Sequence, residues 1–462
     1  MLNKLMFREY DIRGRVDEDL TLEAAEVIGR AYGTFLRRRG VLEAVIGYDA
    51  REYSPRIKNA FVRGLAATGI LAVDVGMVIS PILYFAQYHH HFKGGAMITA
   101  SHNPNGWSGF KLGYDYATTL LPDDIQEMYK IIESGEYASG SGAIEERSGI
   151  IDAYREFVVA RISLKHSLTV VVNAGNCTAG PIVPPILRAL GCTVIEQYCD
   201  IDTRFPNHEP NPTLPEASNA LGAKVKETGA DVGFGYDGDG DRLGVVDELG
   251  RVVWPDQALV LLSRLVLKDA PGARIVFDVK CSQALPEDII AHGGVPVMWK
   301  TGHSYIKQKS KEVDAALGGE RSGHIFFRHG YYSYDDAVFA SLKLLEYLSQ
   351  LDEPFSRTLR DLPQYVSSPT WQVDCADDVK YRVVDQLTVE FKREYGADRV
   401  IDINGARVSF PDGWGLVRAS SNLPVLTLGF EGKTREAMER IMEIFKRKLA
   451  LYPEIGREWK NG

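Results

Sequence analysis

The chain has 462 residues, more than one ordinary hydrophobic core accommodates, so two to four domains are expected. Its composition, 45% hydrophobic and 25% charged residues, is typical of a soluble globular protein. The formal net charge of −9 argues against a broad attraction to nucleic acid or to an acidic membrane, although basic residues gathered at one site could still bind an anionic ligand.

Cysteine usage and apolar segments indicate the cellular location. The five cysteines are scattered and include no CxxC pair, which favours a reducing compartment and argues against structural zinc. The N-terminus, MLNKLMFREYDIRG, lacks the apolar core of a signal peptide. The most apolar long window, GILAVDVGMVISPILYFAQY, is interrupted by Asp74 and Pro81, so no membrane span is expected. We therefore expect a cytoplasmic protein.

The first predicted element is a helix from Thr21 to Arg39, with a basic last turn and Gly40 as its C-cap. Three later stretches then repeat one order of strand, amphipathic segment, second apolar run, third short run and polar loop. Their first strands are AVIGYDARE, LTVVVNAGN and ARIVFDVKCSQ. Their third units are GGAMITASHNP, ADVGFGYDGDGDR and DAALGGERSGH.

Strands that alternate with helical segments predict parallel sheets covered by helices, so the expected fold class is α/β. Ligands bind beyond the carboxyl ends of such strands, which makes the three polar loops the candidate site. From about Ser367 the pattern changes to strand-like runs followed by a helix, which predicts a smaller α+β domain. The apolar face of that helix comprises Met438, Ile441, Met442, Phe445 and Leu449.

These patterns predict four domains, and the stretches between them give the boundaries. The Gly/Ser-rich segment Ser134 to Gly149 is interpreted as a linker. Further junctions are expected near RVVWPDQ, before the helical ALVLLSRLVL, and near DLPQYVSSP. The predicted domains span residues 1–149, 150–254, 255–366 and 367–462.

The stretch YDGDGDR places Asp237, Asp239 and Asp241 at alternate positions around two glycines, where extended backbone would let the carboxylates converge. Their mutual repulsion is costly unless a cation neutralises it, and oxygen ligands suit magnesium or calcium. An EF-hand is rejected, because Arg242 stands where glycine is required and the flanks are strand-like. An acidic surface turn is the alternative. Arg242 beside the triad suggests a metal shared with a phosphate.

Two further loops carry weaker signals. GGERSGH offers Glu320, Ser322 and His324 as hydrogen-bonding partners for a polyol, although a structural histidine is the more common explanation. KTGHSYIK adds Lys300 and His303, which are ambiguous alone.

VRASSNLP combines an arginine, hydroxyls and turn amides between two strand-like runs. That combination can bind phosphate, and a plain β-turn is the alternative. The candidate residues are Arg418, Ser420, Ser421 and Asn422.

The loop ITASHNPNGWSGFK contains Ser101, a candidate reactive hydroxyl. It is not set up as a hydrolase nucleophile, because GxSxG is absent and His102 is expected to point away from the Ser101 hydroxyl. The alternative chemistry is phosphoryl transfer, in which the serine carries the phosphate and a metal neutralises its charge.

TASHNP, DGDGDR, GERSGH and RASSNLP, in this order and spacing, resemble the motifs of the α-D-phosphohexomutase family. The resemblance covers essentially the whole chain and is strongest to the bacterial phosphomannomutase/phosphoglucomutase group. It implies four domains around a central cleft, three of them α/β and one smaller. It also implies an isomerase that interconverts hexose 1-phosphate and 6-phosphate, of mannose or glucose, through a phosphoserine and a 1,6-bisphosphate intermediate, with Mg²⁺.

Two alternatives remain open, a phosphoglucosamine mutase and a non-catalytic relative that binds sugar phosphates. The presence of Ser101, Lys111 and the aspartate triad argues against the non-catalytic relative, because binding alone needs neither nucleophile nor metal. Partners are expected to be small sugar phosphates rather than nucleic acid or membrane. A monomer or small homo-oligomer is expected.

The resemblance also implies roles for individual residues. Ser101 matches the phosphoserine, whose phosphate completes the magnesium site of Asp237, Asp239 and Asp241. Lys111 matches the proposed general base, with Arg13 as a partner that would lower its pKa. The remaining catalytic candidates are His102 and Arg242, and the substrate-binding candidates are Tyr10, Lys300, His303, Glu320, Ser322, His324, Arg418, Ser420, Ser421 and Asn422.

Two positions depart from the family pattern. Arg321 stands in the middle of GERSGH, where the family usually has Met, Gln or Glu. The phosphate loop has Ser421 and Asn422 where Asn and Thr are usual, so a hydroxyl and an amide have changed places.

Overall fold

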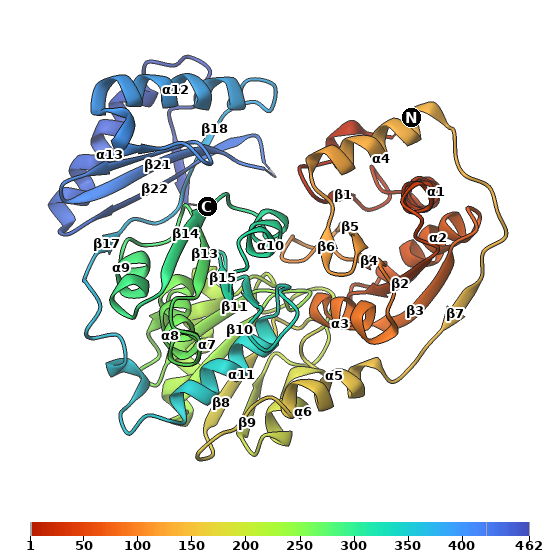
Figure 1. Cartoon of the computed structure of the whole chain (residues 1–462), viewed down its shortest axis with the longest axis horizontal. Coiled ribbons are helices and arrows are strands. Elements are labelled where there is room, and N and C mark those ends of the chain that lie inside the picture. The colour runs from red at the N-terminus through yellow and green to blue at the C-terminus, as the bar shows by residue number, and fades with distance from the viewer. Residues whose placement is uncertain (1, 422, 462) are drawn as a thin grey trace.

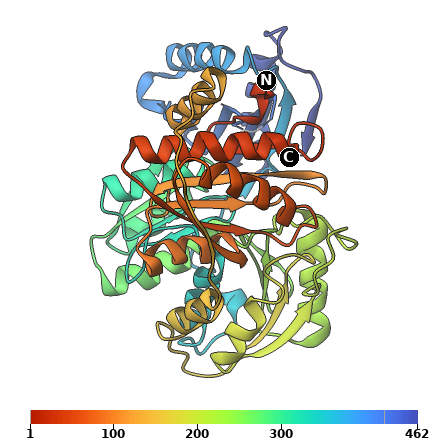
Figure 2. The same ribbon diagram turned by 90° about the vertical axis from the view of Figure 1, so that its right-hand side faces the viewer.

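The computed structural model describes residues 2–421 and 423–461 and contains four sheets in chain order (Figure 1). Both views place the fourth unit at one end of the molecule, away from the second (Figures 1 and 2). In the described part of the chain, no helix is both long and apolar enough to cross a membrane.

The first unit contains a seven-stranded sheet of order β1-β5-β4-β2-β3-β7, with β6 beside β5. Its strands are β1 (Ile12–Arg15), β2 (Glu43–Tyr48), β3 (Leu71–Met77), β4 (Gly94–Ile98), β5 (Trp107–Asp115), β6 (Thr118–Thr119) and β7 (Ile144–Glu146). Its helices are α1 (Leu22–Arg38), α2 (Ser54–Ala66), α3 (Ser80–His90) and α4 (Pro122–Ser134), after a 3₁₀ turn at Lys4–Met6.

Helix α1 starts where Thr21 accepts a hydrogen bond from the amide of Ala24, as expected for an N-cap. Helices α1 and α2 cross at two glycines. A Cβ at Gly29 would lie 2.1 Å from the carbonyl oxygen of Phe61, and one at Gly64 would lie 2.0 Å from that of Glu26. Only glycine allows this close crossing.

The second unit contains a sheet of order β12-β11-β10-β8-β9. Its strands are β8 (Thr169–Asn173), β9 (Thr193–Gln197), β10 (Val232–Tyr236), β11 (Leu243–Asp247) and β12 (Val252–Val253). Its helices are α5 (Ile150–Val159), α6 (Val183–Ala189) and α7 (Pro215–Thr228).

The third unit contains a sheet of order β14-β13-β15-β16. Its strands are β13 (Arg274–Asp278), β14 (Val295–Trp299), β15 (Leu317–Gly319) and β16 (Ile325–Phe327). Its helices are α8 (Pro255–Asp269), α9 (Ala284–Ala291), α10 (His303–Glu312) and α11 (Ala337–Leu348).

The three units share one topology, which confirms the predicted repeat. In each, the first parallel strand lies between the second and the third, and a fourth strand returns antiparallel beside the third. The polar loops around Ser101, Asp239 and Glu320 each join the third strand to this returning strand. They therefore occupy equivalent positions at the carboxyl ends of the parallel strands.

The fourth unit is an antiparallel sheet of order β19-β20-β21-β22-β18-β23, with β17 beside β22. Its strands are β17 (Val366–Ser367), β18 (Trp371–Asp374), β19 (Val400–Ile401), β20 (Ala406–Phe410), β21 (Gly413–Ala419), β22 (Val425–Gly432) and β23 (Trp459–Asn461). Its helices are α12 (Lys380–Tyr395) and α13 (Arg435–Leu449), with a 3₁₀ turn at Ala397–Arg399; the 3₁₀ turn at Phe355–Arg357 lies earlier, at the end of the third unit. The predicted apolar face of α13 packs on the sheet in a separate core.

The interpretation of Ser134 to Gly149 as a linker is only partly right. Within this segment β7 pairs in parallel with β3 and extends the first sheet. Glycines let the chain run close to the α2–β3 turn, since a Cβ at Gly142 would lie 2.1 Å from the carbonyl oxygen of Ile70. A Gly/Ser-rich composition is therefore compatible both with close backbone packing and with a flexible linker.

Candidate functional site

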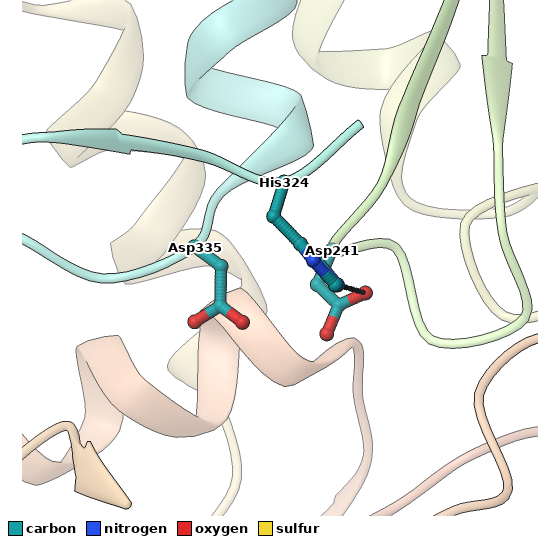
Figure 3. Close-up of side chains that lie close together, drawn as sticks. All are labelled: Asp241, His324 and Asp335. Atoms are coloured by element: carbon teal, nitrogen blue, oxygen red, sulfur yellow. Dashed lines mark ion pairs between the residues drawn. The ribbon is translucent and has the colours of Figure 1, made fainter. Parts of the chain in front are cut away.

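The three equivalent loops meet around the aspartate triad. The hydroxyl of Ser101 donates to Oδ2 of Asp237 at 2.8 Å. The ammonium of Lys111, on β5, donates to Oδ2 of Asp239 at 2.6 Å. Nε2 of His324 lies 3.3 Å from Oδ1 of Asp241 (Figure 3). Residues from three sheets thus converge on one group of carboxylates.

Ser101 lies directly beyond β4 in a backbone conformation that is rare for residues other than glycine, with φ of +51°. Its side chain is buried, and its amide donates to Oγ1 of Thr99 at 2.8 Å. Arg51 supports the loop, donating to the carbonyl oxygens of Ser101 at 2.9 Å and Pro104 at 3.0 Å. Strained backbone held by its surroundings is common at functional sites.

The prediction that His102 points away from the hydroxyl is wrong. Nδ1 of His102 lies 3.2 Å from Oγ of Ser101. The left-handed conformation of Ser101 changes the direction in which successive side chains leave the backbone. Burial first, and then the charges of Arg242 and Arg13, hold the pKa of His102 well below its usual range, so the ring is neutral at pH 7.

The DGDGDR loop is a turn rather than the extended stretch predicted. Gly240 has φ of +70°, and its amide donates to the carbonyl oxygen of Asp237. Oδ1 of Asp237 accepts hydrogen bonds from the amides of Asp241 and Arg242. The turn brings three fully buried carboxylates together.

The triad has the features expected of a cation site. One carboxylate oxygen from each aspartate lies within 4.8 Å of the other two. Among the described residues, Oδ1 of Asp239 is a buried atom without a hydrogen-bond partner. Burial first, and then the charges of Asp241 and Asp239, raise the pKa of Asp237 well above its usual value. Three oxygen ligands that repel one another fit Mg²⁺ or Ca²⁺.

The expected effect of Arg13 on Lys111 is not found. Arg13 donates instead to Oδ2 of Asp11 at 2.7 Å and to Oδ1 of Asn103 at 2.6 Å. Burial alone would lower the pKa of Lys111, but the carboxylates of Asp239 and Asp241 outweigh it, and the pKa is raised. Lys111 is therefore a cation that partly neutralises the triad, and a lowered pKa does not explain a role as base.

In the GGERSGH loop, His324 bridges Asp241 and Glu320. Nδ1 of His324 lies 2.8 Å from Oε2 of Glu320 and 3.3 Å from Oγ of Ser322. Burial opposes the charge on both groups. His324 outweighs burial at Glu320 and lowers its pKa to about 2, while Asp241 first, and then Glu320, outweigh burial at His324 and raise its pKa to about 9. Oε1 of Glu320 accepts the amide of Gly302 at 2.6 Å.

A second buried group lies beside the triad. His303 begins α10, with Nε2 3.6 Å from Oδ1 of Asp11 and Nδ1 3.7 Å from Oδ2 of Asp335. The ammonium of Lys307, one turn later, lies 3.1 Å from Oδ1 of Asp335. The ring of Tyr10 packs edge-on against His303 at 4.9 Å. Asp335 lies beside Asp241 and His324 in Figure 3, and sequence reasoning missed it.

The candidate phosphate loop of the fourth unit joins the site through Asn404, whose Oδ1 accepts from Nε of Arg418 at 2.9 Å and from the amide of Thr301 at 3.2 Å. Nη2 of Arg418 donates to Oγ of Ser421 at 3.3 Å. Ser420, also predicted here, is buried and accepts at its carbonyl oxygen from Nζ of Lys380. Asn422 lies outside the described residues.

Two other residues from the sequence analysis have side chains that contact aromatic or acidic groups other than the triad. The ammonium of Lys300 lies 5.5 Å from the centre of the Tyr305 ring. The guanidinium of Arg321 pairs with Asp256 in the first turn of α8 and lies 4.9 Å from the centre of the Trp254 ring. Arg321 is thus bound to its own unit rather than to Glu320 or Ser322.

Sequence reasoning also missed Asp49 and Arg51, although both stand in the polar end of the quoted AVIGYDARE strand. Nε of Arg51 lies 3.3 Å from Oδ2 of Asp49, and both side chains are fully buried. Charged residues at the end of a strand can therefore have a structural role, supporting a neighbouring loop, as well as a role in binding a ligand.

Replacing Arg51 by methionine is expected to lower the free energy of unfolding by about 3 kcal/mol, because it leaves Asp49 and several loop carbonyls without their buried donor. Urea unfolding followed by circular dichroism measures this. Arg56→Met breaks the exposed pair with Asp17 and is the control, with a loss below about 1 kcal/mol. Equal losses in the two variants would contradict the scaffold role of Arg51.

Four family models match consecutive parts of the chain. They describe the alpha/beta/alpha domains I, II and III and the C-terminal domain of phosphoglucomutase/phosphomannomutase, and they match residues 4–139, 151–250, 254–366 and 372–448.

Curated relatives match over nearly the whole length. The chain is 42% identical over 444 residues to a phosphomannomutase/phosphoglucomutase of Pseudomonas aeruginosa, covering 96% of this chain and 95% of that protein. It is 40% identical over 455 residues to a phosphoglucomutase of Neisseria gonorrhoeae, covering 97% and 98%. A solved structure of a phosphoglucomutase/phosphomannomutase family protein from Burkholderia thailandensis superposes with a TM-score of 0.91 at 40% identity and covers 98% of each chain.

Proposed function

The chain belongs to the phosphoglucomutase/phosphomannomutase family and is a phosphohexomutase, an isomerase of hexose 1- and 6-phosphates, and on this premise we propose which residues carry the reaction. The assignment rests on the position of the Ser101 hydroxyl, which donates a hydrogen bond of 2.8 Å to Oδ2 of Asp237. Ser101 itself has a strained backbone conformation. No other serine hydroxyl that the structure describes is hydrogen-bonded to Asp237.

Ser101 is the phosphoryl carrier. In its phosphorylated form it transfers the phosphoryl group to the free hydroxyl of a hexose monophosphate, which yields the 1,6-bisphosphate and free serine. The bisphosphate then reorients, so that its other phosphate faces Ser101. That phosphoryl group is transferred back to the serine. A hexose 1-phosphate thereby becomes a 6-phosphate, and phosphoserine is regenerated.

Asp237, Asp239 and Asp241, with the phosphate of Ser101, would hold Mg²⁺. When bound, the ion neutralises negative charge on the phosphoryl group as it is transferred. The ammonium of Lys111 and the protonated ring of His324 add positive charge at the same place. The neutral ring of His102 lies against the serine oxygen, and Arg13 fixes Asp11 and Asn103 beside it.

The substrate is bound at both ends. Glu320 and Ser322 bind sugar hydroxyls, and the fourth unit binds the phosphate that does not react. Because the intermediate presents either phosphate to Ser101, these groups must accept two orientations of the sugar. The proposed phosphate-binding residues are Arg418, Ser420, Ser421 and Asn422, and Tyr10, Arg242, Lys300 and His303 complete the proposed site.

The activity is tested by following glucose 6-phosphate formation from glucose 1-phosphate, with a trace of glucose 1,6-bisphosphate and Mg²⁺, in a coupled dehydrogenase assay. We expect turnover that depends on the bisphosphate. The assay is repeated with mannose 1-phosphate and glucosamine 1-phosphate. Glucosamine 1-phosphate as the best substrate would instead support a phosphoglucosamine mutase.

We expect mannose and glucose 1-phosphates to be used with catalytic efficiencies within about tenfold of each other, or about 1.4 kcal/mol. The two sugars differ only in configuration at C2. A loop that binds only hydroxyls common to both sugars has all of its polar groups hydrogen-bonded with either one. Arg321 is held by Asp256, which supports a role outside sugar discrimination. The ratio of kcat/KM for the two sugars should therefore stay unchanged in Arg321→Gln. A hundredfold preference, or a changed ratio in that variant, would contradict this.

We also propose a cytoplasmic monomer or small homo-oligomer, with domains at residues 1–149, 150–254, 255–366 and 367–462. The free thiols of all five cysteines support a reducing compartment. Light scattering after size-exclusion chromatography gives the oligomeric state, and mass spectrometry of limited digests gives the domain boundaries.

A further inference from the structure

Within the triad, Asp239 has one carboxylate oxygen that is doubly hydrogen-bonded and one that is not. Oδ2 accepts from Oγ of Ser80 at 2.6 Å and from Nζ of Lys111 at 2.6 Å. Oδ1 is buried and accepts no hydrogen bond from the residues that the structure describes. The two donors thus set the rotation of the carboxylate and leave Oδ1 for another partner.

Ser80 binds Asp239 twice. It is the first residue of α3 and is fully buried. Its amide, which has no acceptor inside the helix, donates to the carbonyl oxygen of Asp239 at 2.8 Å. Backbone and side chain of Asp239, in the second unit, are therefore both held by one residue of the first.

The neighbouring contact shows how closely the metal loop lies on this helix start. A Cβ at Gly240 would be 2.9 Å from Cγ2 of Ile79. Gly240 also has φ of +70°, so the loop needs glycine both for its turn and for its approach to residues 79–80. The position of Asp239 is thus defined by the first unit as well as by its own sheet.

We propose that Ser80 is a positioning residue of the metal site, which holds Oδ2 of Asp239 so that Oδ1 coordinates the divalent cation. This rests on the proposed assignment of the triad as metal ligands. Partners that orient a ligating carboxylate generally contribute 10- to 100-fold to metal affinity. Unlike Lys111, Ser80 is uncharged and contacts only one member of the triad, so its removal leaves the charge of the site unchanged.

The test measures metal affinity directly. The enzyme is phosphorylated with glucose 1,6-bisphosphate, freed of metal and titrated with Mn²⁺ followed by electron paramagnetic resonance, and with Mg²⁺ by calorimetry. Ser80→Ala is expected to weaken both affinities at least about tenfold. The Mg²⁺ concentration for half-maximal activity should rise equally, while kcat at saturating Mg²⁺ stays near that of the wild type.

Two further variants separate positioning from packing. Ser80→Thr keeps the hydroxyl and should restore most of the affinity. Ser263→Ala removes an equally buried hydroxyl from α8, where it donates only to the carbonyl oxygen of Leu259, and should leave metal affinity unchanged. The thermal unfolding midpoint of the metal-free proteins reports any general loss of packing.

The outcomes are distinct. Unchanged metal affinity in Ser80→Ala, with the wild type binding metal, overturns the role of Ser80 and leaves the metal site intact. No binding of Mn²⁺ or Mg²⁺ by the wild type overturns the metal site itself, and with it this proposal. A lower unfolding midpoint with unchanged affinity would mean that Ser80 only joins the two units.

Discussion

Replacing Ser101 by alanine is expected to lower turnover by about three orders of magnitude or more, because the oxygen that carries the phosphoryl group is lost. Binding of hexose monophosphate should persist, since the proposed sugar and phosphate groups lie in the third and fourth units. The coupled assay measures turnover, and calorimetry with glucose 6-phosphate measures binding. Transfer of label from radioactive bisphosphate to the protein should be abolished.

Ser108→Ala is a matched control for this experiment. Ser108 is fully buried on β5 in the same unit, and its hydroxyl has no hydrogen-bond partner among the described residues. Its replacement should leave turnover and labelling near those of the wild type. Near-normal turnover or labelling in Ser101→Ala would end the assignment of Ser101 as the phosphoryl carrier.

Removing the divalent cation is expected to abolish activity, because three buried carboxylates then repel a phosphorylated Ser101. Addition of EDTA to the coupled assay tests this, and excess Mg²⁺ should restore the rate. Lys111 and the protonated ring of His324 already neutralise part of the triad, but these two positive charges cannot balance three carboxylates and a phosphate. Full activity in the metal-free enzyme would show that the triad serves another purpose.

Asp239→Asn addresses the same site by mutation and is expected to weaken Mg²⁺ binding by about tenfold or more, because a charged ligand becomes neutral. Asp231→Asn is the control. Asp231 stands just before β10, at the end of the strand opposite to the triad. Its carboxylate accepts a hydrogen bond from the amide of Thr169. Calorimetry with Mg²⁺ should separate the two variants, and equal affinities would contradict a ligand role for Asp239.

The fold was predictable because its signals are local. Apolar runs that end in polar loops recur three times, and each recurrence forms the same strand order. The helix start at Thr21 was predictable because its hydroxyl can accept a hydrogen bond from an amide in the first turn of the helix. The error at Ser134 to Gly149 has a simple cause, since residues that favour flexible linkers also permit the close backbone packing found beside Gly142.

The candidate site was predictable only as a set of residues. Local sequence places the three aspartates beyond β10 and Ser101 beyond β4, and the chemistry of carboxylates indicates a hard cation. It could not show that the loop turns at Gly240, or that Oδ2 of Asp239 is bound by Ser80. The contact with Ser80 depends on a residue from another unit of the chain.

The order of elements, the three equivalent loops and the kind of ligand that they bind follow from the sequence alone. Tertiary structure alone decided the protonation states and the partners. Arg13 donates to Asn103 and Lys111 donates to the triad, because contacts between side chains far apart in the sequence are set by how the elements pack. The pKa of Lys111 is raised rather than lowered for the same reason: burial and nearby charge act through space, and neither is encoded in the spacing of a motif.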